Sequence, residues 1–247
     1  MKFNLKVALP VLAGVLVIYT SCNKTSNAPA AQTAGADVVS SQVAASLTQS
    51  LAGTYGGVNL NSGVATPSVI NDNHTVNIPN ALCGFTADVP LDYDTNTGDT
   101  KSHTTGRLIF YFNCINGQPA GYFANDSLRT LGTAPGYSFM YDITQNYVIK
   151  SLNSKNTLLF VNGNLKSFVD LNYSKPGIKP TSDHTNYVLT GLTVDLSNHN
   201  DITSGLATFV STGSNNYGSW NYIGTIKYLG NHKADVTING KVYHVTI

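Results

Sequence analysis

The residues from 92 to 99 include four oxygen-bearing side chains of the kind that bind a hard cation, namely Asp92, Asp94, Asn96 and Asp99. Carboxylate and amide oxygens closely spaced in a tight loop are typical Ca²⁺ ligands. The stretch departs from the EF-hand pattern, because Gly98 comes one position late and His103 occupies the place of the closing glutamate. Two interpretations stay open: a weak calcium site, or a solvated β-hairpin loop with ordinary turn residues.

The remaining polar residues form no known catalytic motif. The six histidines include no His-x-His or His-x-x-x-His pair, and no cysteine lies at a zinc-binding spacing from them. There is no Gly-x-Ser-x-Gly elbow, phosphate-binding loop or dinucleotide-binding fingerprint. Glycoside hydrolysis needs a pair of carboxyl groups, for which Asp88, Asp92 and Asp170 are the candidates. We therefore assign no catalytic residue from the sequence.

Aromatic residues recur at every second position in several segments. Tyr137 and Tyr141 share one face of an expected strand, and Trp220 and Tyr222 share one face of another. Such sets usually pack in a core or pair across strands. The alternative is a weak ligand-binding platform for sugar rings, or the wall of an apolar cavity.

The composition points to an all-β protein with a weakly charged surface. Of the 247 residues, 11% are charged, the formal net charge is +1, and all 13 acidic residues are aspartate. A chain with so little positive charge has no surface that would attract nucleic acid. The 14 tyrosines favour strands, and the frequent asparagine and glycine favour turns.

One short helix precedes the strands in the predicted order of elements. Apolar residues recur every four positions from Val39 to Leu51, so we expect a helix over residues 37–53, capped by Asp37 and ended by Gly53. From residue 54 onward the pattern is one of strands and turns, and Asn239-Gly240 indicates a type I′ hairpin.

The β domain resembles two copies of one unit, over about residues 62–162 and 163–247. The segment 88–93 aligns with 168–173, His103 aligns with His184, and Asn162-Gly163 aligns with Asn239-Gly240. Each copy would form a β-meander of successive antiparallel strands, and neither meander could bury its apolar face alone. We therefore expect an antiparallel β-sandwich or barrel built from two similar meanders.

The first 22 residues have the layout of an export signal. Lys2 and Lys6 precede an apolar run from Val7 to Ile18, which is too short to span a bilayer. Cys22 follows the small residues Thr20-Ser21, and this arrangement resembles the lipobox of bacterial lipoproteins. The resemblance implies cleavage after residue 21 by signal peptidase II and acylation of Cys22, with residues 22–36 as a lipidated cysteine and flexible tether.

The export signal affects the expected redox state of the other two cysteines. Once Cys22 is set aside, Cys83 and Cys114 remain as a pair in an oxidising compartment, where a disulfide is expected. The alternative is a pair of buried free thiols.

These observations predict a membrane-anchored lipoprotein of the bacterial cell envelope, held in a bilayer by Cys22 and facing the periplasm rather than the outside. The predicted role is non-catalytic binding of a glycan or lipid, or a structural role, without a cofactor other than the weak calcium candidate. The alternative function is an envelope hydrolase that acts on glycan through its aspartates.

Overall fold

The computed structural model describes residues 33–64, 68–71, 74–77, 83–84 and 86–247. In this part of the chain one α-helix and a short 3₁₀ helix accompany thirteen strands. The elements are α2 (Ala36–Leu51), β1 (Gly57–Asn59), η1 (Leu60–Ser62), β2 (Ser68–Asn71), β3 (His74–Asn77), β4 (Thr86–Thr97), β5 (Thr100–Ile115), β6 (Gln118–Ala134), β7 (Tyr137–Ser151), β8 (Leu158–Tyr173), β9 (Thr181–Asp195), β10 (Asp201–Asn215), β11 (Gly218–Gly230), β12 (Lys233–Ile238) and β13 (Lys241–Thr246).

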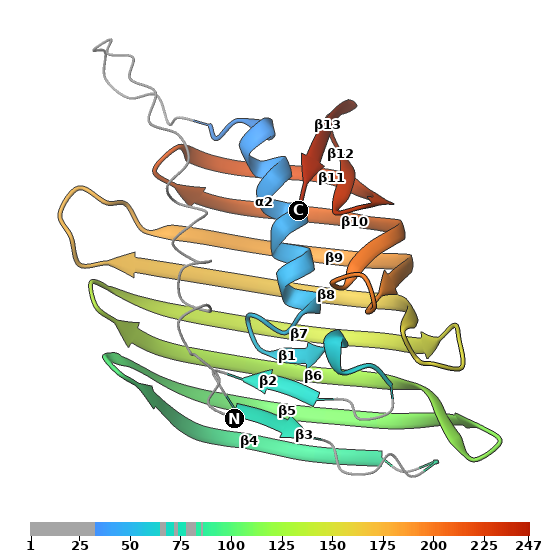
Figure 1. Ribbon diagram of the computed structural model, residues 1–247. Coiled ribbons are helices and arrows are strands. Elements are labelled where there is room, and N and C mark those ends of the chain that lie inside the picture. The colour runs from blue at the N-terminus through green and yellow to red at the C-terminus, as the bar shows by residue number, and fades with distance from the viewer. Residues whose placement is uncertain (1–32, 65–67, 72–73, 78–82, 85) are drawn as a thin grey trace. The chain divides into compact units, whose positions relative to one another are not determined.

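Strands β4 to β13 form one antiparallel sheet in which every strand pairs with its neighbours in the sequence. The order runs from β4 at one edge to β13 at the other, so the sheet is open. Figure 1 shows α2 lying across this sheet on one face. The all-β class with one short helix is confirmed. The sheet is not closed into the expected barrel, and the two expected meanders do not pack face to face as a sandwich, because strands β4 to β13 form one continuous open sheet.

The alternation of side chains explains why one layer suffices. On β5, Leu108, Phe110 and Phe112 are buried on the face that α2 covers, whereas the alternate residues Arg107 and Tyr111 are exposed. The same period of two runs through the other long strands. An antiparallel sheet can leave one face in water when that face is polar enough. We call the two sides the covered face and the uncovered face.

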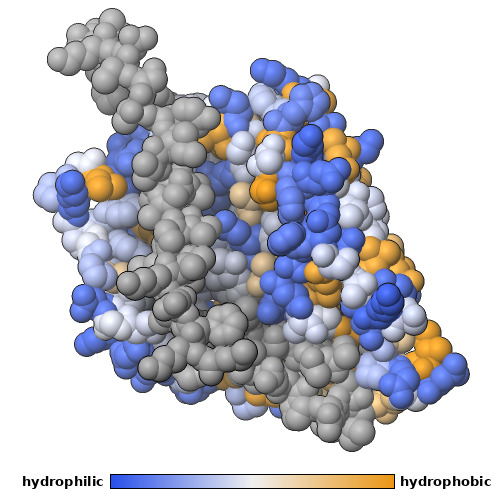
Figure 2. Space-filling view, viewed as in Figure 1, coloured by the Kyte–Doolittle hydropathy of each residue, from blue (hydrophilic) through white to orange (hydrophobic). Residues whose placement is uncertain are grey.

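Helix α2 buries the predicted apolar stripe against the covered face. The side chains that recur every four residues are fully or almost fully buried: Val39, Val43, Leu47 and Leu51. The Tyr187 hydroxyl on β9 donates to the Val43 carbonyl at 3.0 Å. Seen from the helix side, hydrophilic residues dominate the surface over α2 (Figure 2). The helix therefore turns its polar side outward and covers the apolar face beside β11 to β13, while β1 lies against β6 and β7 on the same face.

The ends of α2 differ from the prediction at one point. Gly35 is the N-cap residue, and Asp37 lies inside the first turn without making a side-chain cap. There its negative charge still faces the positive end of the helix dipole. The predicted stop at Gly53 is confirmed, because Gly53 has a φ of +75° just after the last turn.

The two Asn-Gly pairs have different structures. Asn239 and Gly240 form the turn between β12 and β13, both with positive φ, as predicted. Asn162 and Gly163 lie inside β8, where the pairing with β9 shifts by one residue. The Asn162 side chain accepts the N–H of Gly191 at 2.6 Å beside this bulge. The proposed repeat boundary therefore falls within a strand, and the duplication stays a prediction.

The predicted disulfide has the expected geometry. The sulfurs of Cys83 and Cys114 lie 2.13 Å apart, with their Cα atoms 5.4 Å apart. The backbone N–H of Gly84 also donates to the Phe112 carbonyl at 3.3 Å. The bridge therefore attaches the chain entering β4 to the end of β5, at the edge of the sheet.

Candidate functional site

A groove on the uncovered face is the candidate site. It has a volume of about 650 Å³ and opens to solvent over strands β4 to β8. Its lining combines amide, hydroxyl and charged groups with apolar ones. The residues are Asp94, Asn96, Lys101, Ser102, His103, Leu131, Gly132, Thr133, Ser138, Phe139, Met140 and Asn172. Three of them, Ser102, Gly132 and Phe139, occupy covered-face positions of their strands, and the other nine belong to the uncovered face.

The strand register builds this groove from residues that are far apart in the sequence. Four lining residues lie directly opposite one another from β4 to β7, namely Asp94, His103, Leu131 and Met140, and the row continues beyond the lining to Asp170 on β8. Since neighbouring strands lie about 4.8 Å apart, this row is about 19 Å long. Leu131, which is 47% exposed, and Met140 form its apolar centre between two acidic ends.

A histidine and two aspartates form one end of the row. His103 Nδ1 lies 3.0 Å from Asp94 Oδ1, and His103 Nε2 lies 3.6 Å from Asp92 Oδ1. All three side chains are largely exposed to solvent. The imidazole is therefore hydrogen-bonded to Asp94 at the wall of the groove and also lies near the Asp92 carboxylate.

The four calcium candidates do not form the expected loop. Asp92, Asp94 and Asn96 belong to β4 and alternate with inward residues, so they point from one face without converging. Asp99 lies in the following turn. Among the described residues no group of three or more histidine, cysteine or acidic side chains is arranged to hold a metal ion.

A second aspartate–histidine pair stands at the opposite end of the row. His184 Nε2 on β9 lies 3.0 Å from Asp170 Oδ1 on β8. The His184 ring also stacks on Phe168, with centroids 4.7 Å apart. Sequence reasoning named Asp170 and His184 separately, and only the strand register brings them together.

Two arginines form hydrogen bonds with neighbouring side chains on the uncovered face. Arg107 donates two hydrogen bonds to the Asp88 carboxylate, at 2.7 and 2.5 Å. These hydrogen bonds lower the pKa of Asp88. Asp88 is therefore a poor proton donor for hydrolysis. Arg129 donates to the Met140 sulfur at 3.3 Å, which fixes the side chain at the centre of the groove.

The aromatic residues proposed as a platform lie on the covered face. Trp220 is 4% exposed, and its indole N–H donates to Ser211 Oγ at 2.9 Å. The Tyr222 hydroxyl donates to the Ala34 carbonyl at 2.9 Å. Tyr141 packs against the ring of Tyr55, and Tyr137 packs against its neighbours in the same sheet. Tyr141 and Tyr222 therefore fasten covering segments to the sheet, whereas Trp220 and Tyr137 pack within it.

Two acidic groups with raised pKa values are buried on the covered face, away from the groove. Burial raises the pKa of Asp126 to about 8, although Val58 N–H lies 3.1 Å from its carboxylate. Burial also raises the pKa of Asp183, which accepts hydrogen bonds from Gln42 and Thr185. These carboxyl groups support the packing of α2 and β1 and do not line the groove.

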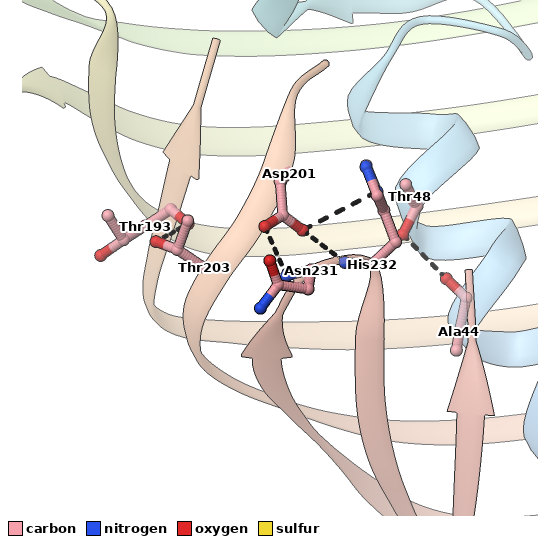
Figure 3. Close-up of polar contacts among 7 residues, drawn as sticks. All are labelled: Ala44, Thr48, Thr193, Asp201, Thr203, Asn231 and His232. Carbon is pink, nitrogen blue, oxygen red and sulfur yellow. Dashed lines mark hydrogen bonds and ion pairs between the residues drawn. The ribbon is translucent and has the colours of Figure 1, made fainter. Parts of the chain in front are cut away.

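A third buried carboxylate organises the turn between β11 and β12. Figure 3 shows Asp201 directed at this turn, where it accepts the backbone N–H groups of Asn231 and His232 at 2.7 and 2.8 Å. Both turn residues have φ near +54°. The adjoining cavity is only about 10 Å³. The cluster is therefore a structural support for the turn.

No family model, curated protein or solved structure matches this chain. Cys22 and the whole predicted signal lie outside the described residues. No helix in the described part of the chain is long and apolar enough to cross a membrane. The geometry of the groove is therefore the basis for a functional assignment.

Proposed function

We propose that the protein is a lipid-anchored protein of the bacterial cell envelope that binds a glycan without catalysis. The observation that carries this proposal is the row across β4 to β8, in which Leu131 and Met140 lie between two aspartate–histidine pairs. The anchor is inferred from the lipobox-like sequence ending at Cys22. The periplasm-facing location is inferred from the same segment.

The chemistry of the groove matches the two kinds of surface on a sugar. A pyranose ring presents C–H groups on one face and hydroxyls around its edge. The exposed apolar centre at Leu131 and Met140 suits the C–H face. Asn96, Lys101 and Asn172 offer hydrogen-bond partners for hydroxyls around this centre. A row about 19 Å long accommodates an oligosaccharide rather than one sugar.

The open, mixed lining favours a glycan over a lipid tail, which would require an enclosed apolar cavity. Binding is also better supported than hydrolysis through Asp88, Asp92 or Asp170. A glycosidase needs a carboxyl group kept protonated beside the substrate. The carboxyl groups whose pKa burial raises, Asp126 and Asp183, are on the covered face.

The proposal is tested by binding of the full-length protein to an array of immobilised tetrasaccharides of neutral hexoses, N-acetylhexosamines and uronic acids. We expect Leu131→Glu to weaken binding by about tenfold or more, because it removes an apolar contact worth on the order of 1–2 kcal/mol. The matched control is Ile223→Glu, an equally charged change at an exposed position on β11. Absence of binding, or equal losses in both variants, would overturn the proposal.

A further inference from the structure

The first described residues, Thr33 and Ala34, pair with the edge of β11. Thr33 forms a parallel bridge with Ser219, and the Ala34 N–H donates to the Ser219 carbonyl at 3.0 Å. The Tyr222 hydroxyl holds the Ala34 carbonyl from the same strand. Thr33, eleven residues after Cys22 in the sequence, therefore lies beside the turn between β10 and β11.

This turn is joined to the longer loop between β8 and β9. The Lys179 N–H donates to Asn216 Oδ1 at 3.0 Å. Together, residues 174–180 and 216–217 form what we call the tether-side corner. It exposes two lysines, Lys175 and Lys179, and Tyr217, which is 40% exposed.

Charged residues are unevenly distributed over the end of the sheet that contains the β10–β11 turn. The turns at the same end, 98–99, 135–136, 174–180 and 216–217, contain one acidic residue, Asp99. Asp99 is in the β4–β5 turn, six strand positions and about 29 Å away from the β10–β11 turn. The tether-side corner itself therefore contains two lysines and no acidic residue.

We propose that the tether-side corner docks on the surface of an anionic lipid bilayer. Eleven chain steps join Cys22 to Thr33, so even a fully extended tether keeps this corner within about 40 Å of the acylated cysteine. Lys175 and Lys179 are attracted to anionic head groups. The Tyr217 ring suits the interface between head groups and water.

The inference rests on the acylated Cys22 of the proposed function, and flotation distinguishes the two. The full-length lipidated protein is mixed with vesicles of phosphatidylcholine, alone or with phosphatidylglycerol. If the protein floats with neither kind of vesicle, the lipid anchor is contradicted, and the docking proposal that depends on it fails as well. Floating protein is treated with an amine-reactive label, and each lysine is quantified by mass spectrometry.

We expect phosphatidylglycerol to slow labelling of Lys175 and Lys179 by about fivefold or more, since two lysines near an anionic surface favour docking by more than tenfold. High salt should remove this protection. The internal control is Lys150 and Lys155, which are exposed at the opposite end of the sheet. Equal labelling of both pairs, or equal protection on neutral vesicles, would overturn the docking.

A second measurement uses hydrogen exchange of residues 174–180 and 216–217 on the same vesicles. Exchange should slow on anionic vesicles for the native protein and for Lys150→Gln/Lys155→Gln. It should not slow for Lys175→Gln/Lys179→Gln, which loses the same number of charges from the tether-side corner. Equal protection in the two double variants would contradict the proposal.

Discussion

Trp220 lies across Gly213, the residue directly opposite it on β10. A Cβ atom at position 213 would lie 2.3 Å from the indole ring and 2.2 Å from the Ser182 carbonyl oxygen. Phe139 covers Gly132 in the same manner, and both pairs are on the covered face. An aromatic ring thus fills the space that a missing side chain leaves on the neighbouring strand.

Replacement of Gly213 by alanine should therefore destabilise the fold. We expect Gly213→Ala to lower the free energy of unfolding by about 2 kcal/mol or more, because the new methyl group meets both a packed ring and backbone. Trp220 is the chain's one tryptophan, so its fluorescence follows unfolding in denaturant. Thr212→Ala, on the exposed side of the same strand, is the control and should cost about 0.5 kcal/mol or less. Equal effects of the two changes would contradict this packing.

The buried Asp126 carboxyl should make stability depend on pH. Its folded pKa of about 8 is above the value of about 3.9 expected in the unfolded chain. Between these values the unfolded state releases the proton first. Rising pH therefore removes stability, by at most about 1.4 kcal/mol per pH unit, and the loss ends above the folded pKa.

Asp126→Asn tests this expectation, since asparagine keeps an acceptor for the Val58 N–H without ionising. The variant should be close to the native protein in stability near pH 4. It should become progressively more stable than the native protein as the pH rises to about 8. Denaturant unfolding of both proteins across this range gives the difference. If the free energies of unfolding of the two proteins change in parallel with pH, Asp126 does not titrate in this way.

Loss of the Cys83–Cys114 bridge should weaken the β4 edge first. The bridge closes a span of 31 residues, so its removal should cost about 3–4 kcal/mol in the chain-entropy model. Hydrogen exchange of Cys83→Ser/Cys114→Ser should accelerate in β4 and β5 more than in β9 and β10. Uniform acceleration across the sheet would contradict a local role for the bridge.

Elements defined by local chemistry were predictable from the sequence. The apolar stripe from Val39 to Leu51 specified the helix, and Asn239-Gly240 specified a turn. Asn162-Gly163 has the same local pattern, but its neighbours on β7 and β9 hold it in a strand. Pairing with two adjacent strands outweighs a turn preference that a single sequence displays.

The groove could not be predicted, because its members meet only through strand register. Leu131 and Met140 resemble ordinary strand residues, and nothing in their spacing indicates that they face solvent opposite each other. Asp94 and His103 are close in the sequence, and here a hairpin would have suggested the contact. The single open layer was also unpredictable, since the apolar half of each strand equally suits a sandwich.

The most direct test of glycan binding is hydrogen exchange of the full-length protein with the best tetrasaccharide from the array, followed by mass spectrometry of the sugar. The account predicts slower exchange in residues 96–103 and 131–140, unchanged exchange in β10 and β11, and recovery of the intact tetrasaccharide. Protection confined to other parts of the sheet would contradict the proposed groove. Recovery of cleaved sugar would contradict a non-catalytic role.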